Sequence, residues 1–274
     1  MLKISHIIHP GPVASSSDLV VAQPITFETM RIASDFARGV VDTRLFAVQF
    51  HDEERMSLPG CFVRTRDLQR SIMDLSVFDG VRKLAILKDI LDRLYVAEPE
   101  ADYMIYTNVD IALQPYFYST VAAIAQQGYD AFIINRRILP DHYKQTSEIP
   151  LMFSELGGVH PGSDCFVFKR DLYKEFVLEN VAIGCHYVGL ALRTNVNIFA
   201  QKFRHFRDLH LTFHIGDQQV WNKHIIDARY NQKELEVVFA KLLENENVVN
   251  RPKLEAFVKQ FQSRIARVSR DNDL

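Results

Sequence analysis

The stretch Tyr103-Met-Ile-Tyr-Thr-Asn108-Val-Asp110-Ile-Ala-Leu113 decides the fold of this chain. Its first five residues are aromatic, aliphatic or β-branched, which predicts a buried strand, and the polar residues that follow mark the point where the strand leaves its sheet. In open α/β sheets, ligands bind beyond the carboxyl ends of the strands. Asn108 and Asp110 are therefore expected at a candidate binding edge.

The spacing of these two residues separates their expected roles. Residues i and i+2 of an extended chain face the same way but lie about 6.6 Å apart along the strand. A hard cation holds its oxygen ligands at about 2.1 Å, so both side chains need not bind one ion directly. We expect Asp110 to bind a metal ion and Asn108 to bind a water molecule or a sugar hydroxyl. In the alternative, Asp110 caps the helix that follows.

Apolar stretches on both sides of this strand alternate between the strand period and the helix period. Further strands are predicted over residues 3–8, 45–50 and 131–135, and helices over residues 26–38, 66–78, 84–94 and 115–127. This alternation favours an α/β fold with a mostly parallel central sheet flanked by helices.

Two amphipathic helices are predicted to follow as a helical C-terminal tail. Asn231 and Glu234 form a capping pair ahead of the apolar stripe of the first helix, and apolar residues at helical spacing from Leu254 to Val268 mark the second. These helices either pack on the sheet or form the surface of a homodimer.

Two longer segments show no regular period. Residues 9–18 form a Gly/Ser-rich segment after the first strand, which is either simply a loop or a place for a nucleotide base and ribose. Residues 136–160 form a long loop inside a compact domain, and such loops are usually functional or mobile. We expect an acceptor-binding region or a lid there, with Arg136 and Arg137 near its root.

The composition is that of an ordinary globular protein. Of the 274 residues, 47% are apolar and 24% are charged, and the net charge of −2 creates no field that would attract nucleic acid or an anionic membrane. The basic and aromatic hexapeptide 202–207 is too short to change this conclusion, so no nucleic-acid partner is expected.

Targeting signals and cysteine usage indicate a cytoplasmic protein. The chain shows no signal-peptide pattern and no apolar run long enough to span a bilayer. Cys61, Cys165 and Cys185 lack metal or redox spacing and are interpreted as reduced, mostly buried thiols. A cytoplasmic protein of this kind is also compatible with a peripheral position at the inner membrane face.

The strand, the triplet Asn108-Val-Asp110 and the apolar helix start together resemble the Asp-x-Asp region of GT-A-fold glycosyltransferases. Members of this fold bind a nucleotide-sugar diphosphate through a divalent cation. Asn108 stands where the family usually has its first acid, which lowers the negative charge of the expected site. The resemblance implies that Asn108 and Asp110 contact the nucleotide sugar and that Asp110 binds the metal.

Two further segments resemble the family in the order that it requires. Gly162-Ser-Asp164-Cys-Phe166 is similar to its Gly-x-Asp-x-Phe segment, which implies that Asp164 is a general base or a sugar-binding acid. The alternative is an aspartate that stabilises a turn.

In the stretch 210–215, apolar residues alternate with His210, Thr212 and His214, the period of a half-buried strand.

The histidines of this strand are candidate metal ligands. A neutral imidazole suits a divalent transition-type ion, and in GT-A enzymes a histidine in the C-terminal part often completes the metal site. The resemblance therefore implies that His214, rather than His210, binds the metal with Asp110. The alternative is a hydrogen-bonded structural histidine.

The resemblance also implies nucleotide contacts on the helix before the Asn-x-Asp strand. Lys88 and Asp89 stand in that place, although charges on an amphipathic helix are often simply solvated. Trp221, the only tryptophan, either stacks on a sugar ring or base or packs in the core.

The resemblance as a whole implies a glycosyltransferase that moves a sugar from a nucleotide-sugar donor to a carbohydrate, lipid-linked or small-molecule acceptor. Mn²⁺ or Mg²⁺ would assist the departure of the diphosphate. Residues 1–274 then form a single domain with a nucleotide-binding half (1–130), an acceptor and metal half (131–228) and a helical extension (229–274).

Two other function classes stay open at this point. A nucleotidyltransferase or metal phosphohydrolase also needs acids and histidines beyond strand ends. A non-catalytic module would bind nucleotide sugars without turning them over.

Overall fold

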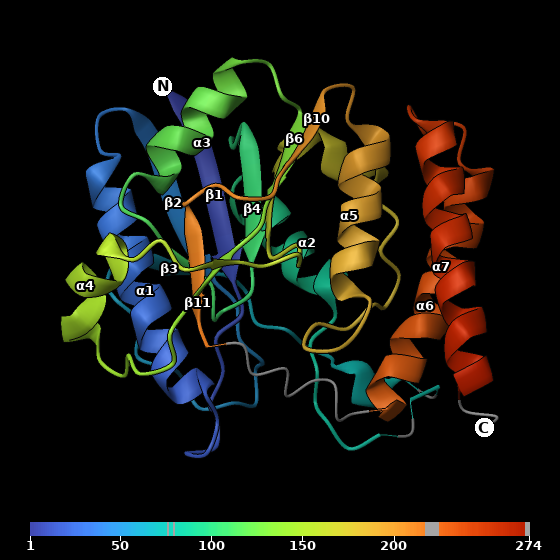
Figure 1. Ribbon diagram of the computed structural model, residues 1–274, viewed down its shortest axis with the longest axis horizontal. Coiled ribbons are helices and arrows are strands. Elements are labelled where there is room, and N and C mark those ends of the chain that lie inside the picture. The colour runs from blue at the N-terminus through green and yellow to red at the C-terminus, as the bar shows by residue number, and fades with distance from the viewer. Residues whose placement is uncertain (76, 79, 217–224, 272–274) are drawn as a thin grey trace.

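The computed structural model describes residues 1–75, 77, 78, 80–216 and 225–271 (Figure 1). Its central sheet has seven strands in the order β10-β6-β9-β4-β1-β2-β3. These are β1 (Leu2–Ile8), β2 (Val41–Ala47), β3 (Phe62–Arg64), β4 (Tyr103–Thr107), β6 (Ala131–Ile134), β9 (Cys165–Lys169) and β10 (Phe203–Phe206). Only β9 runs antiparallel to its neighbours β4 and β6, so the predicted mostly parallel sheet is confirmed.

Alternate residues of the central strands enter two different cores. On β4, Met104 and Tyr106 face one core, whereas Tyr103 and Ile105 face the other. Successive side chains of a strand point to opposite faces, and a sheet buried on both faces needs apolar residues at every position. This explains the continuous apolar run that predicted the strand.

Helices cover both faces of this sheet (Figure 1). Side chains of α1 (Leu19–Phe36) and α3 (Phe117–Gln126) pack into the core on one face. Those of α2 (Leu87–Ala97) and α5 (Val188–Phe199) pack into the core on the other face. The C-terminal helices α6 (Ile225–Glu244) and α7 (Arg251–Asp271) lie beyond α5 and join the same core, so the expected helical tail packs on the domain. A homodimer through these helices stays a prediction.

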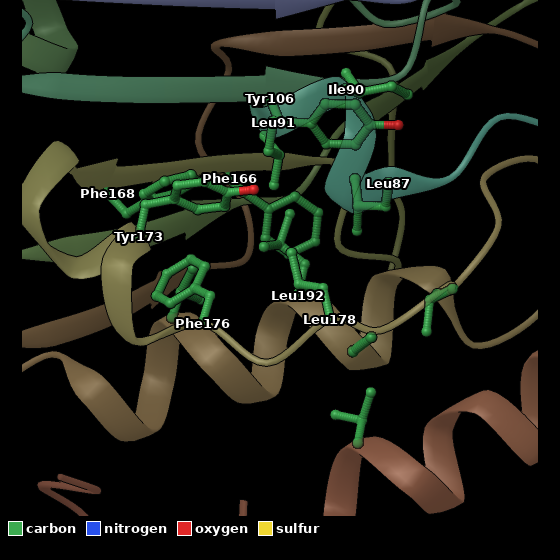
Figure 2. Close-up of a cluster of buried hydrophobic side chains, with 14 of the residues drawn as sticks. Leu87, Ile90, Leu91, Tyr106, Phe166, Phe168, Tyr173, Phe176, Leu178 and Leu192 are labelled. Atoms are coloured by element: carbon green, nitrogen blue, oxygen red, sulfur yellow. The ribbon is translucent and has the colours of Figure 1, made fainter. Parts of the chain in front are cut away.

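Figure 2 shows how α2 is held against the sheet. Its apolar stripe buries Leu87, Ile90 and Leu91 against the aromatic rings of Tyr106 and Phe166. The sequence predicted this stripe from its helical spacing, and the helix begins three residues later than the predicted range 84–94.

A second, four-stranded sheet brings distant parts of the chain together. Its order is β5 (Ala112–Leu113), β11 (Thr212–Ile215), β7 (Arg137–Leu139) and β8 (Gly158–Val159). β11 pairs antiparallel with β5, with Phe213 opposite Ala112, and parallel with β7. β5 starts two residues after Asp110, and His214 follows Phe213 in β11. This pairing therefore brings His214 toward Asp110.

The predicted helix over residues 66–78 is wrong. The described part of this segment contains only a 3₁₀ turn, Ile72–Asp74. Its first residue is preceded by Ser71, whose side chain accepts a hydrogen bond from the Met73 backbone, while the carboxylate of Asp74 accepts one from the Ser71 backbone. Such local side-chain bonds close one turn without extending it.

The predicted capping pair of the C-terminal tail is also wrong, because α6 begins at Ile225 and Asn231 lies inside it. The buried Asn231 amide accepts a hydrogen bond from the Ala182 backbone N–H and donates two, to the carbonyls of Ala182 and His186. Glu234 accepts from the Asn180 backbone. These residues join α6 to the loop before α5 rather than capping a helix.

The segment 136–160 is more ordered than expected, since it contains β7, α4 (Ile149–Ser154) and β8. The predicted first helix starts earlier, at Leu19, and α5 was not predicted at all. None of the helices in the described part of the chain combines the length and apolar character needed to cross a membrane.

Candidate functional site

A cavity of about 800 Å³ lies at the carboxyl edge of the central sheet. It is lined by the loop after β1, the residues after β4, the residues before β9 and the start of α5. Because β9 is antiparallel, its first residues lie at the same edge as the last residues of β4. Asn108, Asp110, Asp164 and His214 therefore all line this one cavity.

Asp110 and His214 contact each other in this cavity. The Nε2 atom of His214 lies 3.3 Å from the Oδ2 atom of Asp110. The opposite ring nitrogen of His214, Nδ1, donates to the carbonyl oxygen of Gly216 at 2.7 Å. Gly216 adopts a left-handed backbone with φ of +71°, which a glycine tolerates without strain. The Nε2 atom is thereby directed at Asp110.

The charges of this pair stabilise each other. Burial would raise the pKa of the Asp110 carboxyl, but the hydrogen bond and charge of His214 outweigh burial, so this pKa lies below its ordinary value. Burial would lower the pKa of His214, but Asp110 outweighs it and the pKa lies above its ordinary value. Asp110 is thus held as a carboxylate, ready to bind a cation.

The pair also fits a divalent metal ion. The Asp110 Oδ1 atom is buried and has no hydrogen-bond partner among the described residues. With Nδ1 of His214 donating to a carbonyl, the neutral ring keeps a lone pair on Nε2, which is the arrangement of a metal-binding histidine. No group of three or more His, Cys, Asp or Glu side chains suited to a metal occurs in the described ranges. A bound ion would therefore take its other ligands from water and substrate oxygens, as Mg²⁺ commonly does.

Asp164 lies in the same cavity beside a cation. Its Oδ1 atom accepts a hydrogen bond from Nη1 of Arg136 at 2.6 Å, and its Oδ2 atom lies 3.8 Å from Nδ1 of His160. Burial raises the pKa of Asp164 above its ordinary value, Arg136 opposes this shift and the charge of Asp110 adds to it. A carboxyl group with a raised pKa is better suited to take a proton than an exposed one.

Gly162 permits the backbone to pass close to this group, as its position two residues before Asp164 suggested. Its N–H donates to Nδ1 of His160 at 2.9 Å. A Cβ atom at this position would lie 2.5 Å from Cε1 of His160 and 3.2 Å from Oδ2 of Asp164.

The structure places the remaining predicted residues as follows. Asn108 lines the cavity, and its Oδ1 atom accepts a hydrogen bond from the Tyr106 hydroxyl at 3.1 Å. His210 lies in the turn before β11, where its ring contacts the side-chain amide of Gln114 at 2.9 Å. Trp221 lies outside the described residues.

The structure does not bring Lys88 and Asp89 to the described lining of the cavity. Lys88 forms an ion pair with Asp92 at 2.6 Å, and Asp89 forms one with Arg70 at 2.8 Å. Two cations that stand just before α2, Arg82 and Lys83, line the cavity instead.

The loop after β1 and the loop after β2 form the end of the cavity beyond Asn108. His9 packs edge-on against Phe50 with 5.3 Å between ring centroids. The Lys83 ammonium lies 4.2 Å from the centre of the Phe50 ring and 3.9 Å from Glu53. The sequence signal that could have found His9, Phe50 and Glu53 is their position, because they follow the ends of the parallel strands β1 and β2.

No family model matches the sequence, and a comparison with the curated proteins found no match. Solved structures of similar fold were found. Crystal structures of S. aureus TarS match with TM-scores of 0.58 for the longer chain and 0.57 for residues 1–349 in complex with UDP-GlcNAc. The chain has a GT-A-like fold.

The match to TarS covers nearly the whole of this GT-A-like chain at low sequence identity. In the longer TarS chain the identity is 10%, with 96% of this chain and 43% of that chain covered. For residues 1–349 the identity is 9%, with 95% and 72% covered. The GT-A-like chain thus spans less than half of the longer TarS chain.

Proposed function

We propose that this protein is a glycosyltransferase that moves a sugar from a nucleoside-diphosphate sugar to an acceptor hydroxyl with the help of a divalent cation. The observation that carries the proposal is the pairing of Asp110 with His214 in a cavity at the carboxyl edge of a GT-A-like sheet. The crystal structures of TarS, whose fold is similar, in complex with UDP-GlcNAc and with UDP support the substrate class.

In this proposal, Asp110 and His214 hold the cation. A Mn²⁺ or Mg²⁺ ion held there would supply positive charge to the leaving diphosphate. Asn108, held by Tyr106, offers its amide to a water molecule or a hydroxyl of the donor. The nucleoside lies toward His9, Phe50 and Lys83 rather than toward Lys88 and Asp89, because the former line the cavity.

Asp164 acts on the acceptor. Its carboxylate accepts a hydrogen bond from the acceptor hydroxyl, orients that oxygen toward the anomeric carbon and takes its proton as the new bond forms. Arg136 holds Asp164 in place through the hydrogen bond to Oδ1, and Oδ2 has no hydrogen-bond partner among the described residues.

The proposed acceptors are carbohydrates, lipid-linked sugars and small molecules. We also propose that the enzyme acts in the cytoplasm. All three cysteines are free thiols, and Cys165 and Cys185 are buried. Free thiols are usual in reducing compartments.

The test is hydrolysis and transfer with a panel of nucleotide sugars that includes UDP-GlcNAc, with and without Mn²⁺. We expect turnover of at least one donor, and we expect Asp110→Ala and His214→Ala each to lower it by about tenfold or more. The exposed residues Asp171 and His51 provide controls, Asp171→Ala and His51→Ala, which keep wild-type rates. Turnover that both site variants retain contradicts the proposal.

Assays with further substrates, and calorimetry with the same nucleotide sugars, separate the other function classes. Turnover of nucleoside triphosphates or simple phosphoesters would indicate a nucleotidyltransferase or phosphohydrolase. Calorimetric binding of a nucleotide sugar without any product would indicate a binding module.

A further inference from the structure

The cavity extends past Asp164 to a region that the proposed mechanism does not use. This region is formed by the start of α5 and by one turn of α7, and its lining includes Tyr187, Arg193 and Phe261. In the central sheet, β6 and β9 lie on one side of β4, and β1 and β2 lie on the other. Because α5 packs over β6 and β9, this region lies on the opposite side of Asp110 from β1 and β2. The donor nucleoside and this region therefore occupy opposite ends of one cavity.

Arg193 is a half-buried cation with an unmet capacity for hydrogen bonds. Its guanidinium carbon lies 5.2 Å from the centre of the Phe257 ring. Its Nε atom is buried without a hydrogen-bond partner among the described residues. Stacking on a ring uses the face of a guanidinium and leaves the N–H groups at its edge, which form a planar fork matched to carboxylate and phosphate oxygens.

Among the described residues, the charged neighbour that acts on Arg193 is a second cation. Burial, and then the neighbouring Arg207, lower the pKa of Arg193. Burial and the same two arginines lower the pKa of His205 to about 4, so this histidine is neutral. A buried cation beside a second cation is costly unless an anion joins it.

Tyr187 provides an aromatic wall next to this cation. It precedes α5 in a left-handed conformation with φ of +71°, which is rare for an aromatic residue and costs about 1 kcal/mol or more. Its ring packs edge-on against Phe261, with 5.6 Å between centroids. Strain of this kind persists where the surrounding structure needs the side chain in one place.

We propose that Tyr187, Phe261 and Arg193 form an acceptor subsite for a sugar that carries an oxyanionic group, a carboxylate or a phosphate. The proposal rests on the proposed glycosyl transfer, since it assigns the end of the cavity that the donor does not use. The aromatic wall packs against the apolar face of the sugar ring, and the fork of Arg193 binds the oxyanion. A hydroxyl of the bound sugar then reaches toward Asp164.

The test is calorimetry with glucose, glucuronate and glucose 6-phosphate as probes, each with and without saturating UDP and Mn²⁺. UDP and Mn²⁺ occupy the diphosphate site and prevent the anionic probes from binding there. We expect at least one anionic sugar to bind about tenfold more tightly than glucose. Comparison of glucuronate with glucose 6-phosphate shows which oxyanion is preferred.

Three variants make the test specific. Arg193→Met keeps apolar contact with Phe257 and should abolish the preference for the anionic probes. Arg204→Met is the matched control, because Arg204 also lies over an aromatic ring, Phe206, but does not line the cavity. Tyr187→Gly suits the left-handed backbone and should weaken all three sugars alike.

The subsite is contradicted if neither anionic sugar binds better than glucose, or if Arg193→Met binds them as the wild type does. UDP binding is measured separately in the wild type. If Mn²⁺-dependent UDP binding is intact while the anion preference is missing, only the subsite is wrong. If neither UDP nor any nucleotide sugar of the panel binds, the proposed transfer is wrong, and the comparison of Arg193→Met with Arg204→Met still decides the anion site.

Discussion

Asp110 and His214 lie with Oδ2 and Nε2 3.3 Å apart, although they belong to different halves of the chain. Antiparallel pairing of β5 with β11 produces this contact, because β5 starts two residues after Asp110 and β11 contains His214. The ligand pair is therefore a product of the folded second sheet and not of local sequence.

Arg136 is predicted to set the pH range in which Asp164 works. The cation lowers a pKa that burial raises, so Arg136→Met should raise this pKa further. Since Asp164 must be ionised to accept a proton, the acidic limb of the rate profile should move to higher pH. The measurement is the pH dependence of kcat for donor transfer.

The neighbouring Arg137 serves as the control for this variant. Arg137 donates to the backbone carbonyls of Gly157 and Asp208. Arg137→Met should therefore leave the acidic limb where it is in the wild type. An unmoved limb in Arg136→Met would show that Asp164 is not the titrating base.

Gly162→Ala is predicted to damage the site without a large effect on folding. The added methyl group would lie 2.5 Å from the His160 ring, which must move away from Asp164. Because small displacements in a reacting site cost much activity, kcat should fall by about tenfold. Gly60→Ala is the control, since a Cβ atom there has no neighbour within 4 Å. Equal rates in both variants would contradict the role of this turn.

Asn231→Ala is predicted to destabilise the domain by about 3 kcal/mol, because it leaves buried backbone groups of Ala182 and His186 without their hydrogen bonds. Urea unfolding of the variant measures this loss. Lys233→Ala, at an exposed position of α6 two residues after Asn231, should change the free energy of unfolding by less than about 0.5 kcal/mol. A small loss in Asn231→Ala would mean that α6 is held by its apolar contacts alone.

The sheet could be predicted because its signals are local. The apolar run Tyr103–Thr107 fits a strand buried on both faces, and the stripe on α2 fits a helix packed against it. The site residues Asn108, Asp110, Asp164 and His214 could be proposed from their places near strands together with the resemblance to GT-A segments, and all four line one cavity.

The features that were missed depend on contacts between distant segments. Asn195 of α5 is buried, and it exchanges hydrogen bonds with the backbone of Val177. A buried polar residue of this kind interrupts the apolar pattern that predicts a helix. Only the folded structure shows the backbone groups with which it pairs. Lys83 was missed because Lys88 and Asp89 were proposed from the resemblance, and only the folded structure shows that Lys83 lines the cavity.

The most direct test of the metal pair is the effect of Mn²⁺ on UDP affinity, measured by calorimetry in the wild type, Asp110→Asn, His214→Ala and the double variant. The account predicts that Mn²⁺ strengthens UDP binding about tenfold or more in the wild type. It predicts that either single variant loses this gain and that the double variant is no worse, because both side chains hold one ion. A full Mn²⁺ effect in His214→Ala would contradict the account.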